Sequence, residues 1–332
     1  MKETVYANER NTLCERAFLS ENSAGRLKPL RPCPVRTDFM RDRDRIIHSK
    51  SFRRLMHKTQ VFLSPEGDHY RTRLTHTLEV SQVARTLARS LRLNEDLTEA
   101  AALGHDLGHT PFGHIGESTL NRLLPGGFRH NEQSLRVAER LENDGQGLNL
   151  CRETLDGILN HSGQNEPKTL EGWCVRRADR IAYINHDIDD AIRGGILKPF
   201  ELPRRCLSVL GETHGERIDT MIRDIVTTSM DQPFVRMSEE VRQASEELRA
   251  FLFEYVYHDE WRKKEEARCD YILSALYEHY LAHPEQLPAE YLEINFTEGA
   301  ERAVCDFIAC MTDRYAIDQF SEIFVPGAFG RR

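Results

Sequence analysis

Histidines and carboxylates of the kinds that bind divalent metals gather in one short stretch of the chain. The run from 104 to 117 contains an adjacent pair, His105 and Asp106. Borderline divalent metals accept imidazole nitrogens and carboxylate oxygens, and such a pair at a helix end can present one of each to the same ion. A His-Asp pair alone is more often an ordinary polar pair, so a metal site here needs further ligands.

Two more residues complete a candidate set of four ligands. His76 lies at the start of an amphipathic segment, and Asp179 lies in a later helical segment. Tyr183 and Asp187 follow Asp179 at i+4 and i+8, so the three lie toward one side of that helix, with an exposed acidic stripe as the alternative. The pattern predicts one divalent ion bound by His76, His105, Asp106 and Asp179.

The order of these residues resembles the H…HD…D signature of the HD superfamily of metal-dependent phosphohydrolases. The wider context is similar to the deoxynucleoside triphosphate triphosphohydrolases, the dGTPase-like branch. The similar segments are 51–61 (SFRRLMHKTQV), 73–77 (RLTHT), 105–117 (HDLGHTPFGHIGE) and 178–183 (ADRIAY). The likeness therefore covers residues 51–190, whereas residues 200–332 add little specific match.

This resemblance implies a reaction, a cofactor and two catalytic residues. Water would attack the α-phosphorus of a deoxynucleoside triphosphate and release the deoxynucleoside and intact triphosphate, with a divalent ion that the sequence does not identify (Mg, Mn, Fe, Ni, Co or Zn). His114 and Glu117 are three residues apart, a spacing that lets two side chains share a helix face. We expect Glu117 to orient His114, which would move a proton as either an acid or a base.

The resemblance also assigns residues to the substrate. Arginines and histidines are expected to bind the triphosphate, namely Arg73, His109, His130 and Arg180. Three polar residues are expected to choose a deoxyribose, by bonding its 3′-hydroxyl and leaving no room for a 2′-hydroxyl, namely Gln60, Tyr183 and Asp187.

Two other functions remain open at this point. One is an HD phosphohydrolase acting on a nucleoside monophosphate or cyclic nucleotide, which the Gln60 and Tyr183–Asp187 sugar positions disfavour. The other is a nucleotide-binding or nucleic-acid-binding regulator without catalysis, which the complete set of four ligands disfavours. An assay that identifies the phosphate product separates these functions.

The elements that position these residues are predicted to be helices. Apolar residues from Val80 to Leu91 follow the helical period, as do those from Val175 to Ala182 and from Val241 to Tyr255. Asn94 is a predicted cap for a helix over 95–107 that ends at Gly108. The sequence therefore predicts an all-α fold, an HD-domain helical catalytic core with a helical C-terminal extension. The expected division is a basic N-terminal segment at 1–60, the catalytic core at 61–200 and the extension at 201–332.

Charge and composition limit the remaining choices. The net charge is −8, yet residues 26–58 are strongly basic, which suits an activating nucleotide or single-stranded DNA as well as a merely solvated surface. No run approaches the roughly 18 apolar residues of a membrane span. The eight cysteines form no C-x-x-C pair and follow no signal peptide, so we expect reduced thiols in a cytoplasmic protein. The resemblance further implies a homo-oligomer.

Overall fold

The computed structural model describes residues 1–60, 71–256 and 260–326 of the chain. Within these ranges the regular structure is helical, and extended pairing is limited to two isolated bridges, Arg26 with Cys151 and Thr59 with Thr72. The predicted all-α fold is therefore confirmed. The predicted boundary between residues 60 and 61 adjoins the segment 61–70, which lies outside the described residues.

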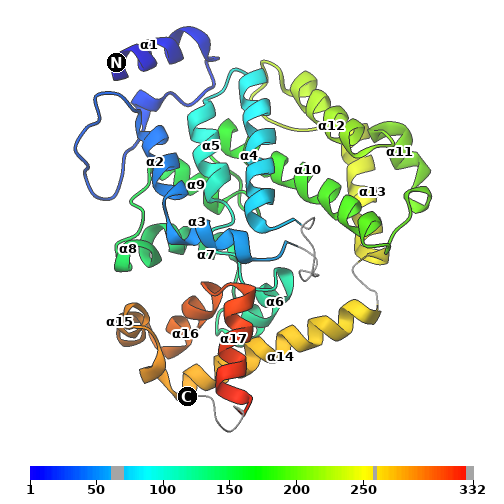
Figure 1. Cartoon of the computed structure of the whole chain (residues 1–332). Helices are drawn as coiled ribbons and strands as arrows, with labels where there is room; N and C mark the ends of the chain where they lie inside the picture. Colours follow the sequence, from blue (N-terminus) through cyan, green and yellow to red (C-terminus); the bar gives the residue numbers. More distant parts are fainter. Residues whose placement is uncertain (61–70, 257–259, 327–332) are drawn as a thin grey trace.

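A bundle of helices around α4 and α10 forms the centre of the upper half in Figure 1. Its members are α2 (Asp38–Ile47), α4 (Arg73–Ser90), α5 (Glu95–Gly104), α9 (Arg152–Leu159) and α10 (Leu170–Arg193). The apolar stripe of α4, including Val80 and Leu87, is buried against Ala178 and Ile181 of α10. This packing fixes the two long helices that carry His76 and Asp179.

The far side of α10 is covered by three further helices. They are α11 (Arg204–Leu210), α12 (His214–Ser229) and α13 (Glu239–Tyr255). Leu248 of α13 and Ile225 of α12 are fully buried in the same apolar cluster as the α4–α10 contact. The apolar face predicted for 241–255 is thus used against α10 and its neighbours as far as Leu252, whereas Tyr255 is exposed.

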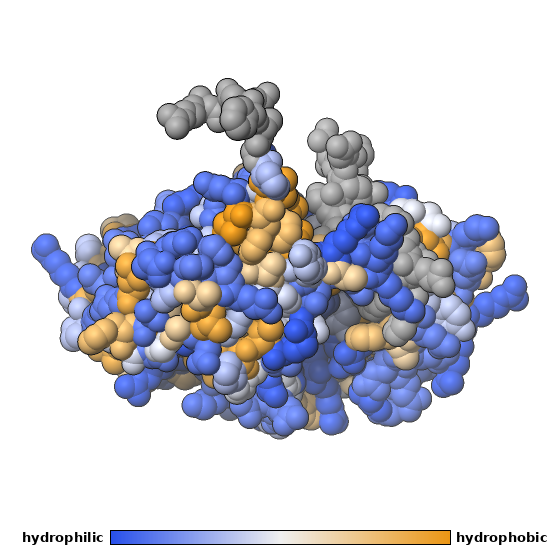
Figure 2. All heavy atoms as spheres, turned by 90° about the horizontal axis from the view of Figure 1, so that it is seen from below, coloured by the Kyte–Doolittle hydropathy of each residue, from blue (hydrophilic) through white to orange (hydrophobic). Residues whose placement is uncertain are grey.

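The C-terminal helices form a second layer, below the first in Figure 1. This layer comprises α6 (His114–Leu123), α14 (Glu260–Ala282), α15 (Ala289–Glu298), α16 (Ala300–Ala309) and α17 (Asp313–Phe324). Its own apolar core includes Leu120 of α6 together with Leu273 and Ile308. Figure 2, seen from below, shows a polar outer face with separate apolar patches. Helix α6 therefore joins the histidine-rich segment to the C-terminal half.

The remaining helices lie outside these groups. They are α1 (Lys2–Thr12), η1 (Ser20–Asn22), α3 (Lys50–Arg54), η2 (Leu55–His57), α7 (His130–Arg136), η3 (Val137–Leu141), α8 (Glu142–Gly145), η4 (Pro199–Glu201) and η5 (Pro284–Gln286). None of the helices in the described part of the chain is both long and apolar enough to cross a membrane. All eight cysteines are free thiols.

One predicted helix end is wrong. Asn94 does cap α5, accepting from the backbone nitrogen of Leu97 at 3.2 Å, but the helix ends at Gly104 and not near Leu107. The backbone nitrogen of Gly108 donates instead to the Ser134 hydroxyl of α7 at 2.9 Å. This bond across to α7 helps draw residues 105–108 out of the helix into a turn, and that turn carries the His-Asp pair.

The basic segment 26–58 is largely neutralised within the fold. Arg26 pairs with Asp42, Arg36 with Asp44, and Arg43 with Glu99. Arg45 donates to the carbonyl oxygen of Leu148 at 2.6 Å. Much of the local charge excess therefore binds the segment to the helical bundle, and less of it is available for an external polyanion than the sequence suggests.

Candidate active site

Three elements bring the four predicted metal ligands together. His76 comes from the first turn of α4, His105 and Asp106 from the turn after α5, and Asp179 from the middle of α10. Nε2 of His76 lies 3.2 Å from Oδ1 of Asp179, and Nε2 of His105 lies 3.8 Å from the same oxygen. His76, His105 and Asp106 also offer ligand atoms that lie within 4.8 Å of one another. The arrangement has the donor types and the spacing of a divalent metal site.

Hydrogen bonds fix which nitrogen of His105 carries the proton. Nδ1 of His105 lies 2.6 Å from the carbonyl oxygen of Ala102, which can only accept, so Nδ1 holds the hydrogen. Nε2 therefore carries a lone pair. It is buried and has no hydrogen-bond partner in the described part of the chain. A buried nitrogen of this kind costs stability unless a ligand meets it, and a metal ion would meet it.

His186 and Glu79 fix the proton of His76 in the same way. Nε2 of His186 lies 3.0 Å from the Glu79 carboxylate and donates to it, which leaves Nδ1 of His186 to accept from Nδ1 of His76 at 3.4 Å. The lone pair of His76 then faces the Asp179 carboxylate. Two acceptors facing each other are stabilised by a cation between them, so the four residues fit a metal.

The carboxylates of the cluster are held ionised. Burial acts to raise the pKa of Asp106, but His105 and Arg73 outweigh it and hold the pKa well below its usual value. Nη1 of Arg73 lies 2.9 Å from Asp106, and both side chains are buried. Burial opposes ionisation of Asp179 too, but the adjacent His76 and His105 rings outweigh it and lower its pKa.

A cavity of about 410 Å³ opens onto this cluster. The predicted site residues that line it are Gln60, Arg73, His76, Asp106, His109, His114, His130, Asp179 and Tyr183. His105 and Glu117 lie behind the lining, where they contact Asp179 and His130. The structure thus gathers most of the predicted residues around one concave site, as expected for a small-molecule pocket.

Arg180 and Asp187 are not among the residues that line this cavity. Arg180 points to Glu246 of α13, with 3.6 Å between the charged atoms, and lines a neighbouring cavity instead. Asp187 is buried. At 100° per residue Arg180 lies well round the helix from Asp179, so a residue adjacent in sequence faces a different space.

Glu117 contacts two histidines, and His130 is the closer. Nδ1 of His130 lies 2.9 Å from Oε1 of Glu117, whereas Nδ1 of His114 lies 3.8 Å from Oε2. His114 is 65% exposed and reaches into the cavity. Glu117 therefore contacts His114, as expected, and also His130, which the start of α7 brings closer to the carboxylate and which the sequence did not link to Glu117.

His130 is held as a cation. Nδ1 of His161 lies 2.7 Å from the carbonyl oxygen of Ile158 and must donate to it, so Nε2 of His161 accepts. Nε2 of His130, 3.1 Å away, therefore donates to His161 while Nδ1 donates to Glu117. Burial acts to lower the pKa of His130, but the Glu117 carboxylate outweighs it and the pKa is raised. Burial lowers the pKa of His161 to about 3, which keeps that ring neutral.

His109 lies between the metal cluster and His130. Its ring stacks on His130 with 4.7 Å between centroids, and burial together with Arg73 holds its pKa well below the usual value. Nδ1 of His109 is buried and has no partner among the described residues. A neutral ring with an unsatisfied nitrogen beside the cavity is suited to bond a substrate atom.

The C-terminal half completes the cavity wall, which the sequence did not predict. Arg249 and Phe253 of α13 and Glu266 of α14 line it together with the residues of the metal cluster. Asp313, at the start of α17, accepts from the backbone nitrogens of Thr59 at 3.0 Å and Phe112 at 2.9 Å. The segments that carry Gln60 and His114 are thereby fixed to the C-terminal helices.

Sequence reasoning also missed His161 and His186. Both lie behind the metal-binding or catalytic side chains, at 3.1 Å from His130 and 3.4 Å from His76. Neither has a short motif around it that marks it as functional. The signal that could have found His186 is its place on the same helix as Asp179, two turns further along.

Comparisons with known proteins agree with this geometry. Residues 73–184 match the HD domain, and residues 235–322 match the phosphohydrolase-associated domain. A deoxyguanosinetriphosphate triphosphohydrolase-like protein of Caldanaerobacter subterraneus subsp. tengcongensis is 58% identical over 98% of this chain and 96% of its own length. A protein of the same description from Clostridium perfringens (strain 13 / Type A) is 51% identical over 98% of both chains.

Proposed function

The chain belongs to the family of deoxyguanosinetriphosphate triphosphohydrolase-like proteins, and we propose that it hydrolyses a deoxynucleoside triphosphate to the deoxynucleoside and inorganic triphosphate. The observation that carries the proposal is the convergence of four ionised or lone-pair ligands at the base of one cavity. HD domains are metal-dependent phosphohydrolase folds, and this chain has the donor set that such chemistry requires.

In this proposal His76, His105, Asp106 and Asp179 hold one divalent ion, whose identity the donor set does not choose. When bound, such an ion polarises a phosphate oxygen and acidifies a coordinated water. The protein's own part is to present lone pairs on both histidines and ionised carboxylates without a proton having to leave first. The bonds from Ala102 and from the His186–Glu79 pair do this in advance.

Proton transfer is assigned to the group of His114, Glu117 and His130. His114 is the exposed member and can reach a water or the 5′-oxygen of the substrate, while His130 is a proton-bearing ring held between Glu117 and His161. General acid-base groups contribute about 10²- to 10⁴-fold to a rate. Whether His114 gives or takes the proton depends on its state in the substrate complex.

The substrate is proposed to lie across the cavity. Arg73 and His109 are placed next to the metal cluster and would bond phosphate oxygens. Gln60 and Tyr183 line the same cavity and would contact the sugar, and Asp187 is buried one turn beyond Tyr183 on α10. Tyr183 would exclude a 2′-hydroxyl by its bulk. Arg180 belongs to the neighbouring cavity, and its role is taken up in the next subsection.

Several broader parts of the proposal rest on the resemblance to the family, on the basic charge of residues 26–58 and on the cysteine pattern. They are the division at residues 60 and 200, assembly into a homo-oligomer, activation by a nucleotide or single-stranded DNA, and a cytoplasmic location. The match to the HD domain falls within 61–200 and the match to the associated domain within 201–332. Gel filtration with light scattering tests the oligomer directly.

A product assay tests the reaction. The metal-loaded chain is incubated with dGTP, dATP, GTP and dGMP, and the phosphate products are separated by ion-exchange chromatography. We expect intact triphosphate from deoxynucleotides, and little from GTP. Release of pyrophosphate or single phosphates would assign the site to the other HD phosphohydrolases, and no hydrolysis with any metal would favour a binding protein.

The metal assignment is tested separately by elemental analysis. His105→Ala and Asp179→Ala should each lose most of the bound metal, because each removes a direct ligand. His57→Ala is the matched control, since His57 is exposed and lies outside the cavity. Stoichiometric metal in both ligand variants would contradict the assignment.

A further inference from the structure

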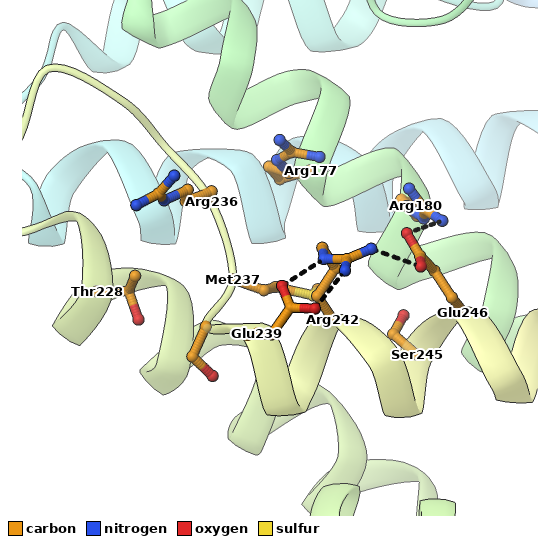
Figure 3. A pocket seen from close by; sticks show the side chains of 10 residues that line it. Arg177, Arg180, Thr228, Arg236, Met237, Glu239, Arg242, Ser245 and Glu246 are labelled. Atoms are coloured by element: carbon orange, nitrogen blue, oxygen red, sulfur yellow. Dashed lines mark hydrogen bonds and ion pairs between the residues drawn. The ribbon is translucent and has the colours of Figure 1, made fainter.

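A second cavity lies beside the proposed active site, on another flank of α10. It has a volume of about 350 Å³, within the range of small-molecule sites, and it is formed by α10, the end of α12 and the first turns of α13 (Figure 3). It shares no lining residue with the catalytic cavity. Its charged lining residues are Arg177, Arg180, Arg236, Arg242, Glu239 and Glu246.

Two of these arginines have no acidic partner among the described residues. Arg177 donates from Nε to the carbonyl oxygen of Val235 at 3.0 Å and lies over the Trp173 ring, 4.8 Å from its centroid. Arg236 lies over the Phe234 ring at 3.9 Å. Burial and the positive charge of Arg180 lower the pKa of Arg177 to about 10. The fold therefore keeps the positively charged Arg177 in this cavity, although both its burial and the neighbouring charge of Arg180 oppose ionisation.

The other two arginines, Arg180 and Arg242, share the carboxylate of Glu246. Arg242 pairs with Glu239 at 2.5 Å and with Glu246 at 2.6 Å, as the dashed lines in Figure 3 show. Arg180 pairs with the same Glu246 at a longer 3.6 Å. Four guanidinium groups thus face two carboxylates in this cavity. The excess positive charge makes the cavity attractive to an anion.

A buried hydroxyl supplies an independent sign of a ligand. Ser245 lines the cavity and is 1% exposed, and its Oγ has no hydrogen-bond partner in the described part of the chain. A buried polar atom without a partner destabilises the fold unless a ligand supplies the missing hydrogen bond. Thr228 and Ser238 add two more hydroxyls to the same wall. Hydroxyls among planar guanidinium groups are the donors that bind phosphate oxygens.

We propose that this cavity binds a polyphosphate chain, either free inorganic triphosphate or the triphosphate of a nucleotide, as a site separate from the catalytic cavity. A chain of several phosphates offers enough charge to meet Arg177 and Arg236 together. The proposal goes beyond the proposed function, because it concerns a cavity that holds none of the proposed catalytic groups.

Binding at this site would be felt at the active site through two helices. Arg180 directly follows Asp179 on α10, and Glu246 lies on α13 one turn before Arg249, which lines the catalytic cavity. A ligand that takes Arg180 away from Glu246 changes the charge balance of both helices. We therefore expect occupancy to alter turnover.

Calorimetric titration of the metal-loaded chain with inorganic triphosphate tests the proposal. The wild type should show two sites per chain. Arg236→Gln and Arg177→Gln should each weaken one of them by about tenfold or more, since each removes a charged hydrogen-bond donor. Arg223→Gln is the control, because Arg223 is an exposed arginine of α12 that pairs with Asp219 and lies outside the cavity. If Arg177→Gln disturbs folding because the bond to the Val235 carbonyl is lost, Arg177→Lys is the second variant, since it removes that bond but keeps the positive charge.

Two further measurements sharpen the result. Affinity at the second site should fall from 50 to about 300 mM salt, because screening weakens charge pairing. A dGTP analogue modified at the α-phosphorus separates the two sources: equal affinities mean that the phosphate chain is the whole ligand, and tighter binding of the analogue means a nucleotide. Identical triphosphate binding by the Arg236→Gln and Arg223→Gln variants would overturn the proposal whatever the product assay shows.

Discussion

The charge state of His130 follows from what its two neighbours are able to accept. Glu117 is an ionised carboxylate and His161 offers only a lone pair, so both nitrogens of His130 must carry hydrogens. The histidine in the cavity that is best placed to stay protonated is therefore one that the resemblance assigned to binding the triphosphate and not to proton transfer. Its role depends on Glu117, which keeps its pKa high.

Glu117→Gln should reduce turnover by about 10²- to 10⁴-fold and move its pH dependence. The folded-state pKa of His130 is raised in the wild type, so the imidazolium is present at low pH and is lost as the pH rises through that raised value. Without the carboxylate the pKa falls, and the alkaline decline of kcat/KM should begin at a lower pH. Glu132→Gln, an exposed neighbour on α7, should leave the profile unchanged. An identical alkaline limb in the Glu117 variant would contradict this role for His130.

Among the elements, the contact of the His-Asp turn with α7 allows no side chain at Gly108. A Cβ there would lie 2.1 Å from the backbone nitrogen of Ser134 and 2.3 Å from the carbonyl carbon of Gln133. Both atoms belong to α7, which begins at His130, so the helix would have to move away from the turn. The distance between the metal ligands and His130 is therefore set by a glycine.

Gly108→Ala should destabilise the chain by about 1–3 kcal/mol and lower turnover, because overpacking shifts backbone. Gly215→Ala is the control: Gly215 lies inside α12 with nothing within 4 Å of its added Cβ, and alanine is the better helix former. Thermal unfolding and kcat measure both variants. Wild-type stability and activity in Gly108→Ala would show that α7 can move without consequence.

The start of α5 carries an acidic residue that costs stability at neutral pH. Burial, with Glu9 and Glu99 nearby, raises the pKa of Asp96 to about 6 against the pull of Arg43. The unfolded value is about 3.9, so between those values the folded state binds more protons. The contribution of Asp96 to the free energy of unfolding should therefore become more favourable as the pH falls from 6 to 4.

Asp96→Asn should raise the free energy of unfolding by about 1–2 kcal/mol at pH 8, after allowing for partial exposure of the side chain. The gain should vanish near pH 4, where Asp96 of the folded wild type is protonated. Urea unfolding at both pH values gives the comparison, with the exposed Asp219→Asn as control. A gain that stays constant with pH would show that ionisation is not its cause.

At the scale of the whole molecule, hydrogen bonds from the C-terminal half hold segments of the active site in place, and we call these contacts the clamp. Asp313 accepts hydrogen bonds from the backbone nitrogens of Thr59 and Phe112. Thr59 directly precedes Gln60, and Phe112 lies two residues before His114. Asp306 of α16, buried among Arg136 and Arg302, accepts from Gln133 of α7 at 2.8 Å. Residues 201–332 therefore position catalytic segments from a distance as well as supplying Arg249 and Phe253.

Asp313→Ala should lower kcat/KM by about tenfold or more, since it leaves two backbone donors without their partner and frees both segments. Asp318→Ala is the matched control on the same helix, because Asp318 is exposed and pairs with Arg314. Circular dichroism checks that both variants fold. Equal kinetics in the two variants would mean that the clamp has no catalytic consequence.

The sequence by itself determined the helical class and the kinds of residue at the metal cluster. Apolar residues at helical spacing define α4, α10 and α13. These helices could be predicted locally because an apolar helix face is buried against whichever apolar surface packs on it. His105 and Asp106 are adjacent, and His76 and Asp179 lie on strongly periodic helices, but it was the resemblance to the H…HD…D signature that implied their convergence.

Only the tertiary structure decided which partner each of the remaining site residues contacts. Glu117 turns to His130 because α7 begins beside it, Arg180 faces Glu246 because α13 covers that flank of α10, and His161 meets His130 across 31 positions. Such pairs depend on how helices cross, and no local spacing encodes that crossing. The assignment of protons, cavities and clamping contacts therefore required the packed molecule.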